Sequence, residues 1–327
     1  MLTLLTAAIQ AIAPAQCSLE LVVLGVSQDG GTPQVNVQDD PAWEDESLRR
    51  RVVSLGVIDH EAGTRYMFEA TPDFREQLHD LNEIAGTEGA PDGVFLTHAH
   101  IGHYTGLMFL GFESMSASEV PVYGLPSMIE FLSTNGPWDQ LVNYENIRPH
   151  ALYDPRNLPD DGLGILSSNV YSVGIYLSEN FTTFEGSETL VEIFEVPHRR
   201  EYAASAGFRI QGPNLSVVFI PDIDSWEEWA EQGTRIADVV LENDVVYVDA
   251  TFFDNNELPG RDMSAIPHPR VSETMDLFQD YPAEIRQRIR FIHYNHTNSI
   301  RYPDSEQALE VLERGYRIAE EGEQVCL

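Results

Sequence analysis

The stretch Val94-Phe95-Leu96-Thr97-His98-Ala99-His100-Ile101-Gly102-His103 decides how this chain is organised. It opens with an apolar β-type run, and residues 104–110 continue it as the start of a buried helix. Side chains alternate along an extended segment, so His98 and His100 project to the same side, whereas His103 falls in the first helical turn. Buried imidazoles need partners for their nitrogens, and a divalent metal ion satisfies several at once. We therefore predict a metal site here, with two ligands for one ion and one ligand for a neighbouring ion.

The composition indicates a globular protein with a large acidic surplus. The 327 residues are 43% hydrophobic, which allows two domains or one large α/β domain. Lys and Arg number 19 and Asp and Glu number 53, so the formal net charge is 19 − 53 = −34. This charge argues against nucleic acid and against an anionic membrane surface as partners. We expect a small-molecule substrate, and the sequence leaves the oligomeric state open.

The two ends of the chain carry features of their own. Residues 2–15 form an apolar run that is too short to span a membrane and resembles the hydrophobic part of a secretory signal, although a basic segment before it is missing. We expect a signal peptide over residues 1–17, one domain over residues 18–327, and a periplasmic or secreted protein; otherwise the protein is cytoplasmic. No other segment is long and apolar enough to cross a membrane. Cys17 and Cys326 leave a disulfide open, and the absence of a CxxC motif excludes a cysteine zinc site.

Three later β-type runs also end next to a side chain that can bind a metal ion. These side chains are His198, Asp222 and His293. A sheet fixes the Cα positions at the ends of its strands, so such side chains are well placed as ligands. We also predict strands over 19–25, 51–58, 64–69, 120–124, 206–210, 215–220 and 245–249, with 290–293 as the last strand, and helices over 74–84, 127–134, 224–232, 272–278 and 306–320.

This ordered pattern resembles the metallo-β-lactamase superfamily, whose central motif is HxHxDH. The resemblance covers nearly the whole chain after about Leu19. Within it, residues 28–34, 70–74 and 293–298 are similar to the branch that includes the pyrroloquinoline quinone biosynthesis protein B group. The resemblance implies an α/β fold, namely a four-layer αββα sandwich in one domain, with the metal site at one edge of the two packed sheets.

The resemblance also implies two sets of ligands for one or two zinc ions. The first set is His98, His100 and His198, and the second set is His103, Asp222 and His293. Asp222 would bridge the two ions, and Asp222 and His103 would carry the catalytic role. Histidine and carboxylate ligands also suit iron or manganese, so the metal is not fixed by the ligands alone.

The motif departs from the family pattern at Gly102, where the family has an aspartate. We expect this change to remove one carboxylate from the second site without a replacement donor. The second ion is then weakly bound, absent, or held by Asp224, Asp73 or His296. Replacing Gly102 by Asp should raise the occupancy of this site if the backbone tolerates a side chain there. His293 and His296 compete for one ligand position, and we favour His293 because it directly follows the strand.

Several acidic residues could orient the ligand imidazoles by accepting hydrogen bonds from them. Glu69, Asp73 and Asp249 are candidate acceptors for the N–H groups of ligand imidazoles, although each fits equally well as a capping or turn acid. His268 lies in a proline-flanked loop, where it either lines the pocket or is a surface residue.

These features leave three functions open. The first is a metal-dependent hydrolase, in which a metal-activated hydroxide attacks an ester, lactone, amide or phosphoester bond of a substrate that the sequence does not name. The second is a protein of the quinone-cofactor biosynthesis type, acting as an iron-dependent oxygenase or as a cofactor carrier. The third is a non-catalytic metal- or ligand-binding protein on the same fold.

Overall fold

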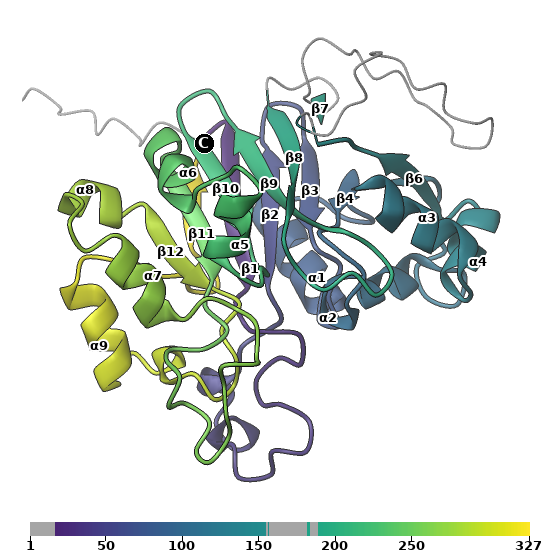
Figure 1. The fold of residues 1–327 in the computed structure, drawn as a ribbon. Helices are drawn as coiled ribbons and strands as arrows, with labels where there is room; N and C mark the ends of the chain where they lie inside the picture. The colour runs from purple at the N-terminus through teal and green to yellow at the C-terminus, as the bar shows by residue number, and fades with distance from the viewer. Residues whose placement is uncertain (1–16, 155, 157–181, 184–188) are drawn as a thin grey trace, which may run out of the picture.

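Two seven-stranded β-sheets lie face to face at the centre of the protein (Figure 1). The computed structural model describes residues 17–154, 156, 182–183 and 189–327. The strands of the first sheet are, in order, β14 (Gln324–Cys326), β1 (Leu19–Gly25), β2 (Ser54–Asp59), β3 (Thr64–Phe68), β4 (Gly93–Phe95), β5 (Val120–Gly124) and β6 (Ile147–Ala151). Those of the second sheet are β13 (Arg317–Ile318), β12 (Ile289–Ile292), β11 (Val245–Asp249), β10 (Ser216–Ile220), β9 (Ser205–Gln211), β8 (Leu190–Val196) and β7 (Thr182–Thr183).

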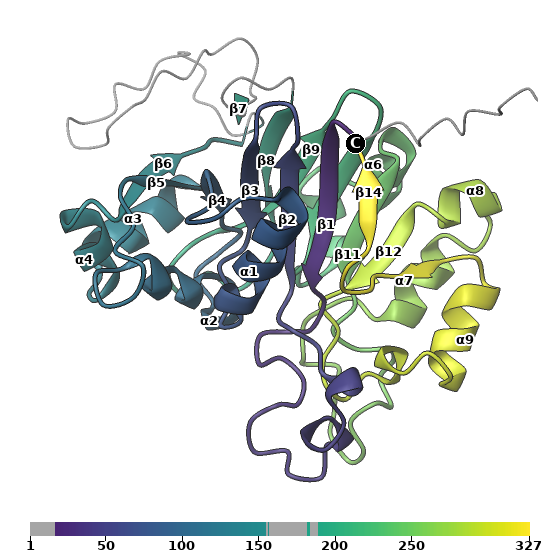
Figure 2. The same cartoon turned by 180° about the vertical axis from the view of Figure 1, so that it is seen from behind.

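Helices cover the outer face of each sheet (Figures 1 and 2). On the first sheet these are α1 (Phe74–Ala85), α2 (Ile101–Tyr104), the 3-10 helix η3 (Thr105–Leu110), α3 (Pro126–Thr134) and α4 (Trp138–Asn143). On the second sheet they are α5 (Trp226–Glu231), α6 (Ile236–Glu242), α7 (Val271–Leu277), α8 (Ala283–Arg286) and α9 (Glu306–Glu313). The order of layers is helix, sheet, sheet, helix, so the predicted αββα sandwich is confirmed.

Strand β1 shows why these sequences form a four-layer structure. Its residues are apolar almost without interruption, because both faces of the strand are covered. Leu21 and Val23 point into the core between the sheets, which also holds Phe208 of β9. Val22 and Leu24 point the other way, into the core beneath α1. A single strand therefore contributes to both hydrophobic cores through its two-residue period.

Aromatic side chains support the start of the histidine stretch. The rings of Phe68 and Phe95 are stacked with centroids 4.7 Å apart, and Phe208 meets both edge-on across the gap between the sheets. Phe95 is the last residue of β4, three positions before His98. This packing fixes the backbone from which the first histidines project.

The strands that precede candidate ligands all end at one edge of the sandwich. β10, β11 and β12 are parallel to one another. β8 and β10 each run antiparallel to β9, so β8 has the same direction as β10. The segments that follow β8, β10 and β12 therefore emerge together, as the sequence pattern predicts.

Several predicted boundaries are wrong. The closing helix ends at Glu313 instead of reaching 320, because Gly315 adopts a left-handed backbone conformation with φ of +87°. The chain then forms β13 and β14, so residues 290–293 are not the last strand. The segment after His103 is the 3-10 helix η3, and most of the predicted signal peptide lies outside the described residues. In the part of the chain that the structure describes, no helix has both the length and the hydropathy needed to span a bilayer.

Cys17 and Cys326 form a disulfide at one edge of the first sheet, where β1 and β14 are neighbours. β14 pairs antiparallel with β1, and this pairing places Cys326 opposite Glu20. The bond closes a loop with a sequence separation of 309 residues. A loop of this length strongly restricts the unfolded chain.

Replacing both cysteines by serine should therefore lower the free energy of unfolding, by up to about 5 kcal/mol. Urea unfolding without reductant measures this change as a lower midpoint. Adding reductant should shift the wild-type midpoint in the same direction and leave the double variant unchanged. Equal midpoints for the two proteins would show that the bond does not stabilise the fold.

Candidate metal centre

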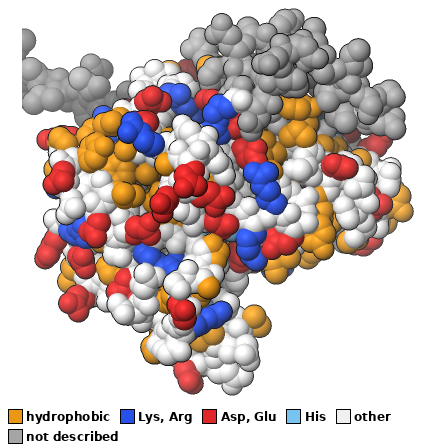
Figure 3. Space-filling view, in the orientation of Figure 1, with side chains coloured by type: hydrophobic (Ala, Val, Ile, Leu, Met, Phe, Trp, Pro, Cys, Tyr) orange, Lys and Arg blue, Asp and Glu red, His pale blue; other side chains and the backbone are white. Residues whose placement is uncertain are grey.

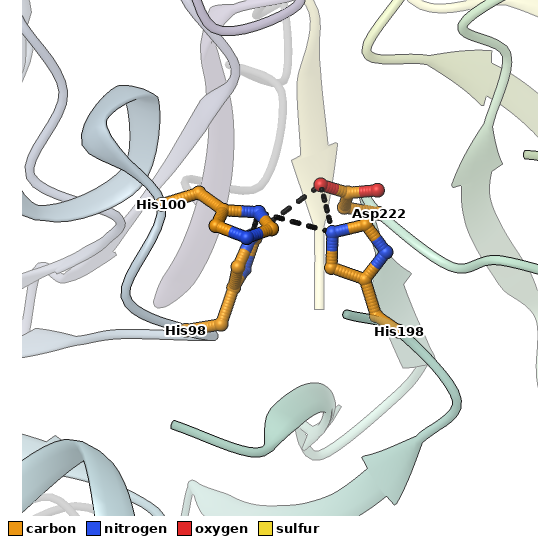
Figure 4. Close-up of side chains that lie close together, drawn as sticks. All are labelled: His98, His100, His198 and Asp222. Carbon is orange, nitrogen blue, oxygen red and sulfur yellow. Dashed lines mark hydrogen bonds and ion pairs between the residues drawn. The ribbon is translucent and has the colours of Figure 1, made fainter. Parts of the chain in front are cut away.

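Three imidazoles and one carboxylate meet at the common edge of the two sheets (Figure 4). His98 and His100 come from the segment after β4, His198 follows β8, and Asp222 follows β10. His98, His198 and Asp222 are buried, and His100 is partly exposed. Residues separated by more than a hundred positions are thus brought together, as the resemblance implies.

The spacing of the inner atoms matches a single metal ion. The Nδ1 atom of His100 lies 2.8 Å from Nε2 of His98 and 3.1 Å from Nε2 of His198. Oδ2 of Asp222 lies 3.4 Å from Nε2 of His98 and 3.1 Å from Nε2 of His198. A tetrahedral zinc ion with bonds of about 2.0–2.1 Å keeps its ligand atoms about 3.3–3.4 Å apart. The four atoms therefore fit around one zinc ion with small adjustments.

The outer nitrogen of His98 is held by a relay through a threonine. The hydroxyl of Thr97 donates its single proton to Oε1 of Glu69 at 2.5 Å, because a buried carboxylate can only accept. The same hydroxyl lies 2.8 Å from Nδ1 of His98 and must accept from it. His98 therefore carries its proton on Nδ1, and the lone pair of Nε2 faces the centre.

His198 and His100 are held by carboxylates directly. Nδ1–H of His198 donates to Oδ1 of Asp224 at 2.6 Å, and Nε2–H of His100 donates to Oε2 of Glu201 at 2.9 Å. In both residues the other ring nitrogen faces the cluster. The first cluster thus presents three nitrogen lone pairs and one carboxylate oxygen to the same point, which is the donor set of a cation.

A second cluster lies beside the first. Its ligand-type atoms come from Asp29, His103 and His293. Nδ1–H of His103 donates to Oε1 of Glu69 at 3.1 Å. Thr251 donates to Asp249 at 2.7 Å and accepts from Nδ1 of His293 at 3.0 Å. The Nε2 atoms of both histidines are therefore free to bind a cation, and both are buried without a hydrogen-bond partner among the described residues.

Asp222 lies between the two clusters. Its Oδ2 atom lies 3.4 Å from Nε2 of His98, 3.1 Å from Nε2 of His198 and 3.8 Å from Nε2 of His103. His268 lies behind it, with Nδ1 at 3.2 Å from Oδ1 of Asp222 and 2.8 Å from Oδ2 of Asp249. The side chain of His268 is 9% exposed and lines the cavity beside the site, with φ of +83°, so His268 is not a surface-loop histidine.

The charges of the cluster are strongly perturbed. Burial lowers the pKa of His98 well below its ordinary value. Burial also opposes the charged form of His198, but the carboxylates of Asp222 and Asp224 outweigh it and raise the pKa of His198 to about 9. Burial disfavours the ionised form of Asp222, yet its histidine neighbours hold its pKa well below the usual range. Such a site takes up a metal ion by releasing protons.

The remaining predicted residues divide into two groups. Glu69, Asp224 and Asp249 bind ligand imidazoles or their threonine partners. His296 and Asp73 are not in either cluster: the first bonds its neighbour Asn295, and the second accepts from the backbone N–H of Val52. Of His293 and His296, which compete for one predicted ligand position, His293 lies in the second cluster.

A carboxylate that the sequence analysis did not consider lies at the position of the motif aspartate. The side chain of Asp29 lies beside Gly102, and a Cβ atom on Gly102 would meet Oδ1 of Asp29 at 2.5 Å. Gly102→Asp is therefore not tolerated without movement of the loop that carries Asp29. The sequence analysis used residues 28–34 only for the family resemblance and gave Asp29 no role. It did not single out Thr97, Thr251 or Glu201 as partners of the histidines.

Replacing His100 by Ala should remove metal from the first cluster. Only two imidazoles and the carboxylate shared with the second cluster then remain as ligands, and these should not retain the ion. Metal content after dialysis against a weak chelator measures this loss. His60→Ala is the matched control, since His60 pairs with Glu20 in the turn at the other end of the first sheet. Equal metal content in wild type and His100→Ala would contradict the assignment.

Replacing Asp224 by Ala should weaken metal binding at the first cluster by about 10–100-fold, because His198 loses the acceptor that orients it. Competition with a chromophoric chelator measures the affinity. Glu231→Ala, an exposed acid in α5, should bind metal as the wild type does. Unchanged affinity in Asp224→Ala would show that this hydrogen bond does not support the site.

Comparisons with known proteins agree with the fold. A family profile described as "Beta-lactamase superfamily domain" matches residues 64–294, more than half of the chain. The coenzyme PQQ synthesis protein B of Methylococcus capsulatus is 24% identical over 93% of this chain and 99% of its own length. The counterpart in Methylobacterium radiotolerans is 23% identical over 93% and 98%.

Solved structures show the same architecture. The Zn(2+)-bound PqqB from Methylobacterium extorquens superimposes with a TM-score of 0.69 at 19% identity, covering 94% of this chain and 100% of that one. A diphosphatase from the PhnP family gives a TM-score of 0.59 at 16% identity, with coverages of 94% and 98%. The human short-form tRNase Z gives 0.53 at 15% identity, with the same coverages. The chain belongs to the beta-lactamase superfamily and lies on a branch similar to coenzyme PQQ synthesis protein B.

Proposed function

We propose that the protein is a metal-dependent hydrolase that uses zinc at the two clusters. One observation carries this proposal: five buried or half-buried histidines each bind an acceptor with one ring nitrogen and turn the other toward a common centre. Two carboxylates, Asp29 and Asp222, lie among these inner nitrogens. This donor set fits zinc, which takes nitrogen and oxygen ligands.

The centre has the parts that hydrolysis needs. When bound, zinc lowers the pKa of its water toward neutrality and supplies hydroxide at working pH. Asp222 is only 4% exposed, with Nδ1 of His268 at 3.2 Å from its Oδ1 and Nε2 of His198 at 3.1 Å from its Oδ2. A carboxylate so placed can accept a hydrogen bond from the attacking water and orient it. His268 itself donates Nδ1–H to Oδ2 of Asp249 at 2.8 Å.

A neutral or cationic substrate suits the surroundings better than an anionic one. A cavity of about 470 Å³ adjoins the first cluster through Asp224 and His268. Glu228 and Glu273 also line it, so its three acids outnumber its one arginine, Arg270. Figure 3 shows Asp and Glu side chains dispersed over one face of the molecule, in line with the net charge of −34. Carboxylates repel phosphate groups. Among ester, lactone, amide and phosphoester bonds, this favours the first three.

The second candidate function is the quinone-cofactor type. It is supported by the relatives named coenzyme PQQ synthesis protein B, which match 93% of this chain. Histidine and carboxylate ligands also suit iron, so an iron-dependent oxygenase fits the same donor set. A cofactor carrier on the same site would bind its ligand without turnover.

An oxidising compartment is the proposed location. The disulfide between Cys17 and Cys326 supports it, because such bonds persist in the periplasm and outside the cell. The apolar run over residues 2–15 supports it from the sequence.

Metal analysis followed by a substrate panel tests the proposed function. The purified protein should contain zinc and hydrolyse neutral esters or lactones faster than phosphodiesters. Stripping with a chelator should abolish turnover, and added zinc should restore it. His100→Ala serves as the inactive reference and His60→Ala as the active one.

Three results would count against the hydrolase. Turnover that survives both metal removal and His100→Ala would place the chemistry elsewhere. Bound iron with oxygen-dependent product would support the second candidate. Metal binding without turnover of any class in the panel would leave a binding protein.

A further inference from the structure

Asp29 fills the space that a side chain at position 102 would need. A Cβ atom on Gly102 would lie 2.5 Å from Cα and 2.5 Å from Oδ1 of Asp29, which is closer than real side chains approach. An aspartate at position 102 and the present position of Asp29 therefore exclude each other. The glycine that interrupts the HxHxDH pattern is what admits this second carboxylate.

The carboxylate of Asp29 is aimed at the inner nitrogens of the second cluster. Its Oδ1 atom lies 3.0 Å from Nε2 of His103 and 3.8 Å from Nε2 of His293. Both histidine side chains are 0% exposed. All three atoms are buried without a hydrogen-bond partner in the described part of the chain. Nδ1 of His103 already donates to Glu69, so Nε2 of His103 and Oδ1 of Asp29 need a cation between them, which is either a proton or a metal ion.

The loop that carries Asp29 is attached to the strand end that carries His293. Gln28 donates its backbone N–H to the carbonyl of Tyr294 at 3.0 Å, and Tyr294 donates to Val26 at 3.1 Å. Gly31 donates to the carbonyl of Gln28 at 2.8 Å and has φ of +67°, which closes the turn around Asp29. The backbone therefore holds Asp29 next to His293 independently of any ligand.

We propose that Asp29 is a metal ligand: it supplies, from the loop after β1, the carboxylate that the motif lacks at position 102, and completes a second metal site with His103, His293 and the bridging Asp222. This site rests on the proposed two-ion centre and deepens it. Two imidazoles and two carboxylates form a harder donor set than the first cluster's three imidazoles and one carboxylate. The second site should therefore accept manganese or iron more readily than the first.

Counting zinc ions on stripped and reloaded protein tests this assignment without any substrate. The wild type should bind two equivalents in calorimetric titration and in metal analysis. Asp29→Ala and Asp29→Asn should each bind one, with loss of the weaker binding phase. Asp39→Ala is the matched control, because Asp39 is an exposed acid in the same connection, and it should bind two.

Two further variants test the pair of positions. Asp29→Gly should bind one equivalent, because it removes the carboxylate. Gly102→Asp should not increase zinc binding, since a Cβ atom there would meet the backbone Cα of residue 29 at 2.5 Å. A variant that lost both equivalents and its thermal transition would be misfolded, and Asp29→Asn, which keeps the shape of the side chain, then decides.

Two equivalents in Asp29→Asn, or one equivalent in the wild type, would overturn the assignment and leave Asp29 as an ion-pair partner of protonated His103. Failure of the hydrolase proposal has a different signature. In that case the zinc counts follow the pattern above, and no substrate in the panel is turned over.

Discussion

Each histidine of the centre has one ring nitrogen committed to an acceptor behind it, and this constraint determines what the site can hold. Glu69, Asp224 and Glu201 accept directly from His103, His198 and His100. Thr97 donates to Glu69 and accepts from His98. Thr251 donates to Asp249 and accepts from His293 in the same way. With these protons fixed outside, the inner nitrogens are lone pairs, and lone pairs brought together in a buried volume require a cation.

The sandwich makes this convergence possible because strands that are distant in sequence end at one edge. The ligands follow β4, β8, β10 and β12, and each strand is fixed by its ladder and by the two hydrophobic cores. Glu69 supports both clusters at once. It follows β3, is fully buried, and serves one histidine in each cluster, His98 through Thr97 and His103 directly. Loss of this one carboxylate would loosen both clusters.

The sequence identified strand-end side chains that the structure brings together, because a polar side chain directly after an apolar run is a local pattern. It predicted the order of layers through the family resemblance. It could not place Asp29, because an aspartate beside two glycines is typical of a turn. Only the folded structure shows that Asp29 lies against Gly102. It could not find Glu201 either, since that contact with His100 depends on how a loop 101 residues away packs. The closing helix was predicted to reach residue 320, but it ends at Glu313 because the backbone turns at Gly315.

A zinc-soaked crystal measured at the zinc absorption edge tests the central claim most directly. The account predicts two anomalous peaks about 3.5–4 Å apart, one among His98, His100 and His198 and one among Asp29, His103 and His293. A single peak, or peaks remote from these histidines, would contradict it.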